Sequence, residues 1–482
     1  MSTQRQVEVA IIGAGTAGMT AYRSALAHTG SVLVIEDGPY GTTCARVGCM
    51  PSKLLIAAAE AAHTIVHAGR FGVHGGPLRV DGAAVMARVR AERDRFVGFV
   101  TDAVDAWPAE HRLRGRACFV DAHTLEVSGP DGVERVQAGR IVIATGSRPA
   151  LPARWRDLGD RLVTNAEVFD WHTLPASVAV VGTGVVGLEL AQALHQLGVR
   201  VRLYGRERVG PLTDPLLQAL AREIFAAALP LTLDARQLMP RREADAVIMA
   251  CTDAAGRVHE ERFDLLLAAT GRRPNVDRLG LENTGLPLDA GGVPLYDRRT
   301  GQIGDSPVFI AGDAAEDRPL LHEAADDGRI AGDNAGRWPD LRVRPRRAPL
   351  AVVFSQPQIM LAGASHAELS AAGSAFATGA VSFEDQGRSR VIGRNQGALH
   401  VFGDPDSGRF LGAEMIGPAA EHIGHLLAWS VQRGDTVQQM LDSPFYHPVI
   451  EEGLRSALRR LQRALRMGPP PVERCLDCGP GA

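Results

Sequence analysis

The sequence predicts an α/β protein with two Rossmann-like dinucleotide-binding domains, one inserted into the other, followed by a separate C-terminal α+β domain. Three observations predict it. A glycine-rich turn joins a strand-like run to a helix-like run near the N-terminus, the same device recurs near residue 182, and from about residue 349 short alternating strands precede helices. The length of 482 residues is roughly three times that of a usual domain, which leaves room for this organisation.

The first glycine-rich turn stands in the context that a dinucleotide fingerprint requires. A strand-like run over residues 7–12 precedes it, a helix-like run follows it, and the next strand-like run, residues 31–35, ends in an acid. The first glycine permits a tight turn, the second lets a pyrophosphate approach the backbone, and the third lets the helix pack on the strand. The acid can accept hydrogen bonds from a ribose diol. These residues are Gly13, Gly15, Gly18 and Glu36.

The second turn, with Gly182, Gly184 and Gly187, follows a strand-like run over residues 177–181 and starts another helix-like run. Two such devices in one chain predict two bound dinucleotides.

Three further short strands are expected to complete the two nucleotide folds. Two of them end in Thr-Gly, one with Thr145 and Gly146 and the other with Gly271, and the third ends in Gly312 and Asp313. The predicted domains are a first nucleotide fold over 1–150 and 276–348, a second over 151–275, the α+β domain over 349–467 and a flexible tail over 468–482.

Two cysteines, Cys44 and Cys49, lie at the start of a predicted helix. The pair suits a redox disulfide, because a helix N-terminus and a nearby cation favour a thiolate at neutral pH. The alternatives are two structural cysteines or half of a zinc site. No second Cys/His pair at zinc spacing stands nearby, so no metal is expected. Lys53, in the same helix, is the only lysine among 52 basic residues, which indicates a site where a planar guanidinium would not serve.

Near the other end of the chain, His447 precedes Glu452. A histidine and a glutamate at this spacing are commonplace, and the bland interpretation is an ordinary core or surface histidine. The pair gains significance because dithiol chemistry needs a base near neutral pH, oriented by a carboxylate.

The composition disfavours several other classes. The 52 basic residues face 55 acidic ones, so there is no excess positive charge to hold a nucleic acid. No apolar run is long enough to span a membrane. Six cysteines are too few for a disulfide-stapled secreted scaffold, so a cytoplasmic protein is expected.

With these motifs in this order, from about residue 7 to residue 466, the chain resembles the flavoprotein disulfide reductases of the dihydrolipoamide dehydrogenase, glutathione reductase and mercuric reductase group. The segment from Cys44 to Lys53 is the most specific part. Its Pro-Ser-Lys ending is more like dihydrolipoamide dehydrogenase and mercuric reductase than glutathione reductase. Mercuric reductases lack the histidine that His447 matches, so dihydrolipoamide dehydrogenase is the favoured resemblance.

The resemblance implies FAD in the first nucleotide fold, NAD or NADP in the second, and a homodimer with its active site across the interface. It also implies that Cys49 exchanges electrons with the flavin and Cys44 with the substrate. His447, held by Glu452, would move the proton, and both residues would come from the partner subunit.

Further site residues follow from the same resemblance. Lys53 matches a lysine that pairs with a glutamate, here Glu189, beside the flavin, and Asp313 matches the acid that binds the ribityl chain. Thr42 departs from the family, which usually has a second glycine there, and its bulk could alter access to the flavin or the substrate. The residues expected to contact the cofactors are Gly13, Gly15, Gly18, Glu36, Lys53, Thr145, Gly146, Gly182, Gly184, Gly187, Arg206, Arg208, Gly271, Gly312 and Asp313.

The choice of nicotinamide nucleotide depends on the end of the second strand of the second fold. An acid there would favour NAD, but Gly205 takes the place that Glu36 has in the first fold. Arg206 and Arg208 follow and suit a 2′-phosphate, so the sequence slightly favours NADP or dual use. Gly187 is instead typical of NAD sites, and surface arginines are ordinary in this chain.

The leading function is oxidation of a dithiol such as dihydrolipoamide, or the reverse reaction. The alternatives are an NADPH-dependent reductase of another disulfide, of the glutathione, thioredoxin or mercuric type, and a redox-sensing flavoprotein or component of a multienzyme complex. The tail carries Cys475 and Cys478. This pair is either a terminal pair without a role in turnover or an electron relay to bulky or metallic substrates.

Overall fold

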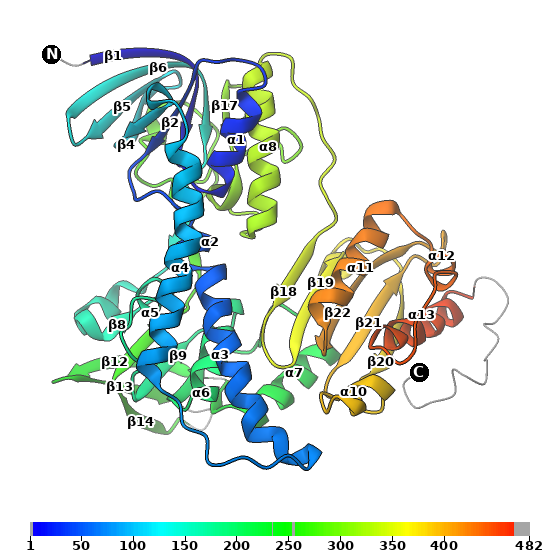
Figure 1. Ribbon diagram of the computed structural model, residues 1–482. Coiled ribbons are helices and arrows are strands. Elements are labelled where there is room, and N and C mark those ends of the chain that lie inside the picture. Colours follow the sequence, from blue (N-terminus) through cyan, green and yellow to red (C-terminus); the bar gives the residue numbers. More distant parts are fainter. Residues whose placement is uncertain (1–2, 234, 253–255, 467–482) are drawn as a thin grey trace. The chain divides into compact units, whose positions relative to one another are not determined.

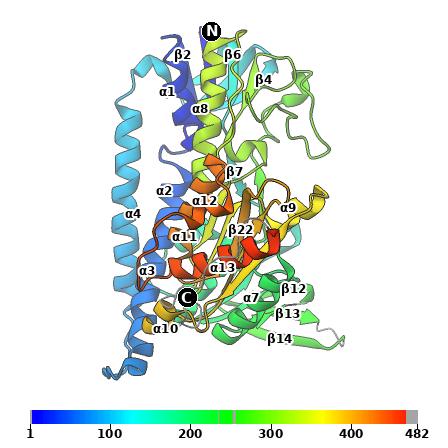
Figure 2. The same cartoon turned by 90° about the vertical axis from the view of Figure 1, so that its right-hand side faces the viewer.

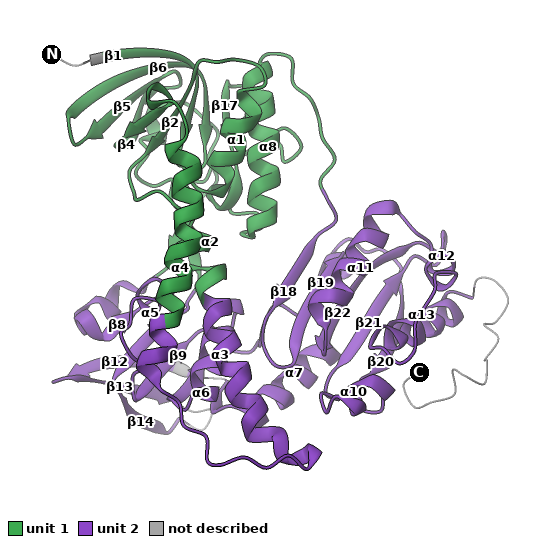
Figure 3. Ribbon diagram, in the orientation of Figure 1, with its two compact units in different colours: residues 1–51, 88–150, 271–346 green, residues 52–87, 151–270, 347–482 purple. Residues whose placement is uncertain are grey.

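The computed structural model describes residues 3–233, 235–252 and 256–466. The chain forms two compact units (Figure 3). The first comprises residues 1–51, 88–150 and 271–346, and the second comprises residues 52–87, 151–270 and 347–482. Each unit is thus assembled from segments that are far apart in the sequence, as insertion of one nucleotide fold into another requires. The predicted domain bounds themselves stay a prediction.

The first unit is built on a seven-stranded sheet with the order β3-β2-β1-β6-β5-β4, and β17 also pairs with β6 (Figure 1). The pairs β1–β2, β1–β6, β2–β3 and β6–β17 are parallel, whereas β4–β5 and β5–β6 are antiparallel. The strands are β1 (Thr3–Ile12), β2 (Val32–Glu36), β3 (Arg112–Arg114), β4 (Arg116–Asp121), β5 (Thr124–Gly129), β6 (Gly132–Ile143) and β17 (Val308–Ile310).

Two helices, α1 and α8, lie side by side against one face of this sheet (Figure 2). Gly328 and Gly332 of α8 allow the close approach, because a Cβ atom at either position would lie within 2.3 Å of a backbone carbonyl oxygen of α1. The helices with residues in this unit are α1 (Thr16–Ala25), α2 (Thr43–Val47), α3 (Cys49–His67), α4 (Gly82–Asp105) and α8 (Leu321–Arg337). The strands β7 (Ser147–Pro149) and β16 (Arg272–Pro274) form a small antiparallel pair.

The second unit contains a parallel sheet of the order β11-β10-β9-β15-β8, which is fringed by the antiparallel sheet β12-β13-β14. The strands are β8 (Leu162–Val163), β9 (Ser177–Val181), β10 (Arg200–Tyr204), β11 (Leu231–Thr232), β12 (Arg236–Glu243), β13 (Ala246–Thr252), β14 (Val258–Phe263) and β15 (Leu265–Ala268). The helices of this nucleotide fold are α5 (Asn165–Val168), α6 (Val185–Gln196) and α7 (Pro215–Ala228).

The same unit also contains an antiparallel sheet of the order β18-β19-β22-β21-β20, which α11 and α13 cover. The parallel and antiparallel sheets together confirm the predicted fold class. The elements are β18 (Leu350–Val353), β19 (Gln358–Gly363), β20 (Ala377–Ser382), β21 (Ala398–Gly403), β22 (Phe410–Gly417), α9 (His366–Ala371), α10 (Gly387–Val391), α11 (Ala420–Arg433), α12 (Val437–Leu441) and α13 (Glu451–Leu465).

A buried polar contact joins the second nucleotide fold to this antiparallel sheet. Asp214 caps the N-terminus of α7 and lies 2.7 Å from Nδ1 of His400 on β21. Glu414 stands opposite His400 on β22 and accepts hydrogen bonds from the backbone N–H groups of Thr213 at 2.6 Å and Asp214 at 3.0 Å. Burial alone would raise the pKa of Asp214, but the hydrogen bond and charge of His400 hold that pKa below its ordinary value.

Replacing Asp214 with Asn tests this contact, because an amide oxygen can still cap α7 but carries no charge for His400. The folded-state pKa of Asp214 lies below the unfolded value, so its stabilisation is present above about pH 4 and is lost as the pH falls through the folded-state pKa. We expect Asp214→Asn to lose about 1–3 kcal/mol of unfolding free energy at neutral pH. The loss should shrink below about pH 4 in urea unfolding followed by circular dichroism. A loss of the same size at every pH would contradict this interpretation.

Candidate functional site

The first glycine-rich turn joins β1 to α1 and is closed everywhere except at its middle glycine. A Cβ atom would lie 2.4 Å from the carbonyl oxygen of Ala144 at Gly13, and 1.9 Å from the carbonyl oxygen of Gly13 at Gly18. At Gly15 it would meet nothing within 4 Å. The backbone is therefore packed tightly on both sides and open where the helix begins, which is the shape of a cradle for a phosphate group.

The acid of the first motif is held at the rim of this turn. Glu36 ends β2, and its carboxylate accepts hydrogen bonds from the backbone N–H of Ala14 at 2.7 Å and of Gly38 at 2.7 Å. Each carboxylate oxygen keeps a further lone pair. Glu36 can therefore stay fixed to the turn and still accept a hydrogen bond from a ligand.

A second polar cluster follows β6 and β17 in the first unit. Asp313 accepts a hydrogen bond from the Ser147 hydroxyl at 2.7 Å, and that hydroxyl accepts one from Nε of Arg272 at 2.8 Å. Burial lowers the pKa of Arg272, which the charge of Asp313 partly opposes. The hydroxyl of Thr145 is buried and has no hydrogen-bond partner within the described residues. An orphaned buried hydroxyl, two residues before the serine that holds the Asp313 carboxylate, fits a ligand rich in hydroxyl groups.

The other predicted glycines of this region allow backbone conformations that residues with side chains rarely adopt. Gly146, Gly271 and Gly312 adopt φ values of +66°, +114° and +69°.

The second glycine-rich turn, between β9 and α6, repeats the geometry of the first. A Cβ atom would lie 2.1 Å from the carbonyl oxygen of Ala269 at Gly182 and 1.8 Å from that of Gly182 at Gly187, whereas Gly184 faces open space.

The strand end beside this turn differs from its counterpart in the first fold. At Gly205 a Cβ atom would lie 2.3 Å from Cγ2 of Thr183, so no acidic side chain fits there. Arg206 and Arg208 follow, and both are exposed.

The two cysteines contact each other at the junction of α2 and α3. Cys44 is half-buried, and Cys49 is exposed at the first residue of α3. The hydrogen bond of Cys44 to the Cys49 side chain, together with burial, raises the pKa of the Cys44 thiol. Thr42 caps α2, because its hydroxyl accepts the N–H of Ala45 at 3.1 Å. The threonine that replaces the expected glycine thus fixes the turn that carries Cys44.

Lys53 meets Glu189 in the second unit. Its Nζ lies 2.9 Å and 2.7 Å from the two carboxylate oxygens of Glu189, which is only 4% exposed. The same carboxylate accepts the backbone N–H of Phe354 at 2.9 Å, and Nζ lies 4.7 Å from the centre of the Phe354 ring. One turn along α6, the amide of Gln192 bonds both the carbonyl and the N–H of Gln356 at 2.7 Å.

His447 and Glu452 form the pair that the sequence predicts. Nδ1 of His447 lies 3.0 Å and 3.1 Å from the two carboxylate oxygens of Glu452. The histidine side chain is 76% exposed and the glutamate side chain 5% exposed. Glu452 also accepts the N–H of Val449 at 3.2 Å and the guanidinium of Arg455 at 3.2 Å. The carboxylate is therefore anchored from three sides, and the far edge of the imidazole faces outward.

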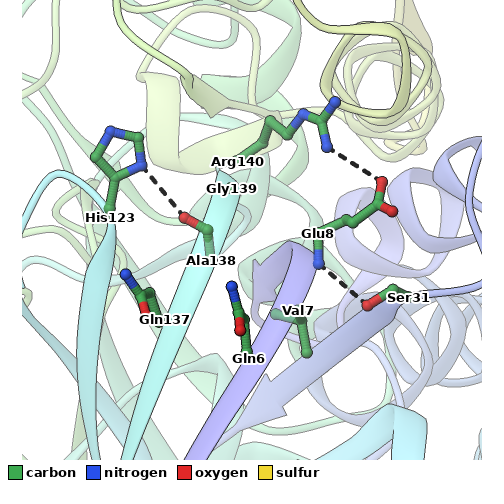
Figure 4. Close-up of a pocket in the computed structure, with 9 residues that line it drawn as sticks. All are labelled: Gln6, Val7, Glu8, Ser31, His123, Gln137, Ala138, Gly139 and Arg140. Carbon is green, nitrogen blue, oxygen red and sulfur yellow. Dashed lines mark hydrogen bonds and ion pairs between the residues drawn. The ribbon is translucent and has the colours of Figure 1, made fainter.

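Other features lie outside this set of residues. A cavity of about 450 Å³ in the first unit is lined by residues of β1, β6 and two loops, including Glu8, His123 and Arg140 (Figure 4). None of the predicted residues lines it. Within the described residues, no group of three or more potential ligands is arranged for a metal ion, and no helix is long and apolar enough to cross a membrane. Cys475 and Cys478 lie outside the described residues.

Several partners of the predicted residues escape sequence reasoning. Phe354 and Arg455 contact predicted residues but belong to no motif that marks them. Ser147 and Arg272 directly follow the two Thr-Gly turns, and the sequence indicates only a structural role for Arg272. Gln192 had a usable signal, because it lies one helical turn after Glu189 and so on the same face of α6.

The matched glycines of the second turn allow a direct test. Gly184→Ala should fold normally, because its φ of −73° is allowed and its Cβ meets nothing. The added methyl group should nevertheless obstruct the approach of a pyrophosphate and raise the dissociation constant of the nicotinamide nucleotide about tenfold or more, which is about 1.4 kcal/mol. Gly187→Ala should instead lower the thermal unfolding temperature, because its Cβ overlaps a carbonyl oxygen. Calorimetry and nucleotide titration measure both effects, and equal behaviour of the two variants would contradict the assignment.

Comparisons with known proteins agree with this arrangement. Residues 7–328 match the pyridine nucleotide-disulphide oxidoreductase family, and residues 350–458 match its dimerisation domain, which supports a homodimer. The chain is 30% identical to the dihydrolipoyl dehydrogenase of Haloferax volcanii, over 93% of this chain and 95% of that protein. It is 32% identical to the mercuric reductase of Streptomyces lividans, over 92% of this chain and 93% of that protein.

Among solved structures, LpdA from Mycobacterium tuberculosis superposes with a TM-score of 0.81 at 25% identity and covers 95% of this chain and 99% of its own. The chain therefore belongs to the class I pyridine nucleotide-disulfide oxidoreductases, a family that uses FAD together with NAD or NADP.

Proposed function

We propose that this protein passes electrons between a nicotinamide nucleotide and a dithiol through Cys44 and Cys49, with the activity of a dihydrolipoyl dehydrogenase. The hydrogen-bonded pair of thiols at the start of α3 carries the proposal. The exposed His447, tied to Glu452, supplies the base that dithiol chemistry needs.

The residues around the first glycine-rich turn fit FAD. The open backbone at Gly15 would receive the pyrophosphate, Glu36 a ribose, and Asp313 with Thr145 the hydroxyl groups of the ribityl chain. When bound, FAD supplies a ring that exchanges a hydride with the nicotinamide and electrons with a thiolate. Lys53, fixed by Glu189, matches the lysine that in this family carries a positive charge beside that ring.

The thiol chemistry then follows from the two cysteines. A substrate thiolate attacks Sγ of Cys44 in the Cys44–Cys49 disulfide, and Cys49 leaves as a thiolate. The second substrate thiol, once deprotonated, attacks the substrate sulfur of this mixed disulfide and releases Cys44. The substrate loses two electrons and two protons, and the cysteine pair gains the electrons. His447 takes a proton from each substrate thiol in turn, passes the first to the released Cys44 thiolate, whose raised pKa favours the thiol, and keeps the second.

The proton carrier is oriented by its carboxylate. Because Nδ1 of His447 donates to Glu452, the lone pair lies on Nε2 at the exposed edge of the ring. In the proposed homodimer this edge acts on the cysteine pair of the partner subunit.

We favour NADP as the nicotinamide nucleotide. No acid can stand at Gly205 to accept the 2′-hydroxyl of NAD, and Arg206 and Arg208 can donate to a 2′-phosphate. The same observation supports the second candidate function, an NADPH-dependent reductase of another disulfide.

An assay panel separates these functions. Purified enzyme with FAD is supplied with dihydrolipoamide and NAD or NADP, and in the reverse direction with lipoamide, glutathione disulfide or oxidised thioredoxin and NADH or NADPH. The proposal expects the highest kcat/KM with the lipoamide couple. A preference of more than about tenfold for glutathione disulfide or thioredoxin would replace it with the second function.

His447→Gln tests the proposed base. General acid–base catalysis typically contributes two to four orders of magnitude, so disulfide turnover should fall by about 100-fold to 10,000-fold. Reduction of FAD by the nicotinamide nucleotide, measured by stopped flow, should change little. His422→Gln is the matched control, since His422 is an exposed histidine of the same domain and lies outside the site. Near-normal disulfide turnover of His447→Gln would show that His447 is an ordinary surface histidine and not the base.

A further inference from the structure

We propose that Glu414, a buried carboxylate of the antiparallel sheet, positions the loop that carries Arg206 and Arg208 and thereby sets the selectivity for the nicotinamide nucleotide. The loop runs from Gly205 to Asp214 and joins β10 to α7. This inference rests on the proposed function, because it assumes that the two arginines bind a 2′-phosphate.

The first end of the loop is tied to the glycine-rich turn itself. Thr183, which stands between Gly182 and Gly184, donates its hydroxyl to the carbonyl oxygen of Arg208 at 2.5 Å. The carbonyl oxygen of Thr183 accepts the N–H of Gly210 at 2.8 Å. The backbone that carries the arginines therefore has a fixed place beside the phosphate cradle.

The middle of the loop is held by one amide from α7. Gln218 accepts the N–H of Val209 at 3.2 Å and donates to the carbonyl oxygens of Val209 at 3.0 Å and Leu212 at 2.7 Å. Gln218 is buried, so these bonds are shielded from competition with water.

The far end of the loop is held by the antiparallel sheet. Glu414 is 0% exposed and accepts the backbone N–H groups of Thr213 at 2.6 Å, Asp214 at 3.0 Å and His366 at 2.9 Å, as well as the Thr213 hydroxyl. The hydroxyl of Thr213 in turn accepts the N–H of Ala367 at 2.9 Å. A single carboxylate thus collects four donors, three from Thr213 and Asp214 at the end of the loop and one from His366 of α9.

The chemistry of these contacts requires an anion. A carboxylate has only acceptors, and all four partners of Glu414 are donors. Glutamine at this position would turn an N–H group toward another N–H group and leave buried donors unsatisfied. A loosened loop would have to be ordered again when the nucleotide binds, and this cost would weaken the contacts of Arg206 and Arg208. NADH lacks the 2′-phosphate and would not depend on those contacts.

The test compares Glu414→Gln, Thr213→Val and Thr213→Ser with the wild-type holoenzyme. Valine keeps the shape of Thr213 but removes the hydroxyl. Serine keeps the hydroxyl, so Thr213→Ser should behave like the wild type. We expect Glu414→Gln and Thr213→Val to raise KM for NADPH about tenfold, to change KM for NADH by less than about twofold, and to leave kcat within about twofold. Titration with 2′,5′-ADP, which carries the phosphate but no nicotinamide, should show the same loss of affinity. FAD content and circular dichroism monitor folding.

Arg206→Ser and Arg208→Ser separate this inference from the proposed function. If neither arginine variant changes the ratio of kcat/KM with NADPH to kcat/KM with NADH, the NADP assignment fails and this inference fails with it. If the arginine variants lower the ratio but Thr213→Val, folded and loaded with FAD, leaves it unchanged, Glu414 does not act through the loop and this inference alone is overturned. Equal losses of kcat/KM with NADPH and NADH in Glu414→Gln and Thr213→Val would overturn it as well. So would a Thr213→Ser variant that does not keep the wild-type ratio.

Discussion

The ion pair between Lys53 and Glu189 is the interaction on which the rest of the second unit depends. Glu189 is almost fully buried, and a buried carboxylate that loses its partner costs about 3–5 kcal/mol. The Glu189 carboxylate, on α6, accepts hydrogen bonds from the Lys53 ammonium of α3 and from the backbone N–H of Phe354. It therefore holds together three segments that are far apart in the sequence. The contact binds Lys53 of α3, the helix that begins at Cys49, to α6. The only lysine of an arginine-rich chain therefore stands where a compact cation meets both a carboxylate and an aromatic ring.

The two glycine-rich turns repeat one backbone device, which we propose serves two ligands. Their packing is the same, with a closed first and third glycine and an open middle one. The difference lies at the end of the following strand, where Glu36 is bound to its own turn and Gly205 leaves the space to Thr183. The two turns thus share one backbone cradle and differ in a few side chains beside it, and our proposals place nucleotide selectivity in those side chains and in Glu414 of the antiparallel sheet.

The fold and much of the site could be predicted from the sequence because their signals are local. The turns combine fixed glycine spacing with flanking strand and helix patterns, and the cysteines lie five residues apart at a helix start. The residues that the sequence did not predict contact partners that are far away in the sequence. Arg272 reaches Ser147, and Glu414 reaches Thr213, without any periodicity that would connect the partners. Thr42 could be seen as a departure, but its role as a cap depends on the geometry of α2.

The most direct test of the electron path is differential thiol labelling. Trypsin cleaves after Arg46, so Cys44 and Cys49 fall in different peptides. Oxidised holoenzyme is incubated anaerobically with or without one equivalent of NADPH, denatured, alkylated and analysed by mass spectrometry. We expect disulfide-linked peptides without nucleotide and two alkylated peptides with it, while Cys118 and Cys251 are alkylated equally in both samples. A linked pair that survives both NADPH and NADH, or two free thiols in the oxidised enzyme, would contradict a role of Cys44 and Cys49 as the electron carrier.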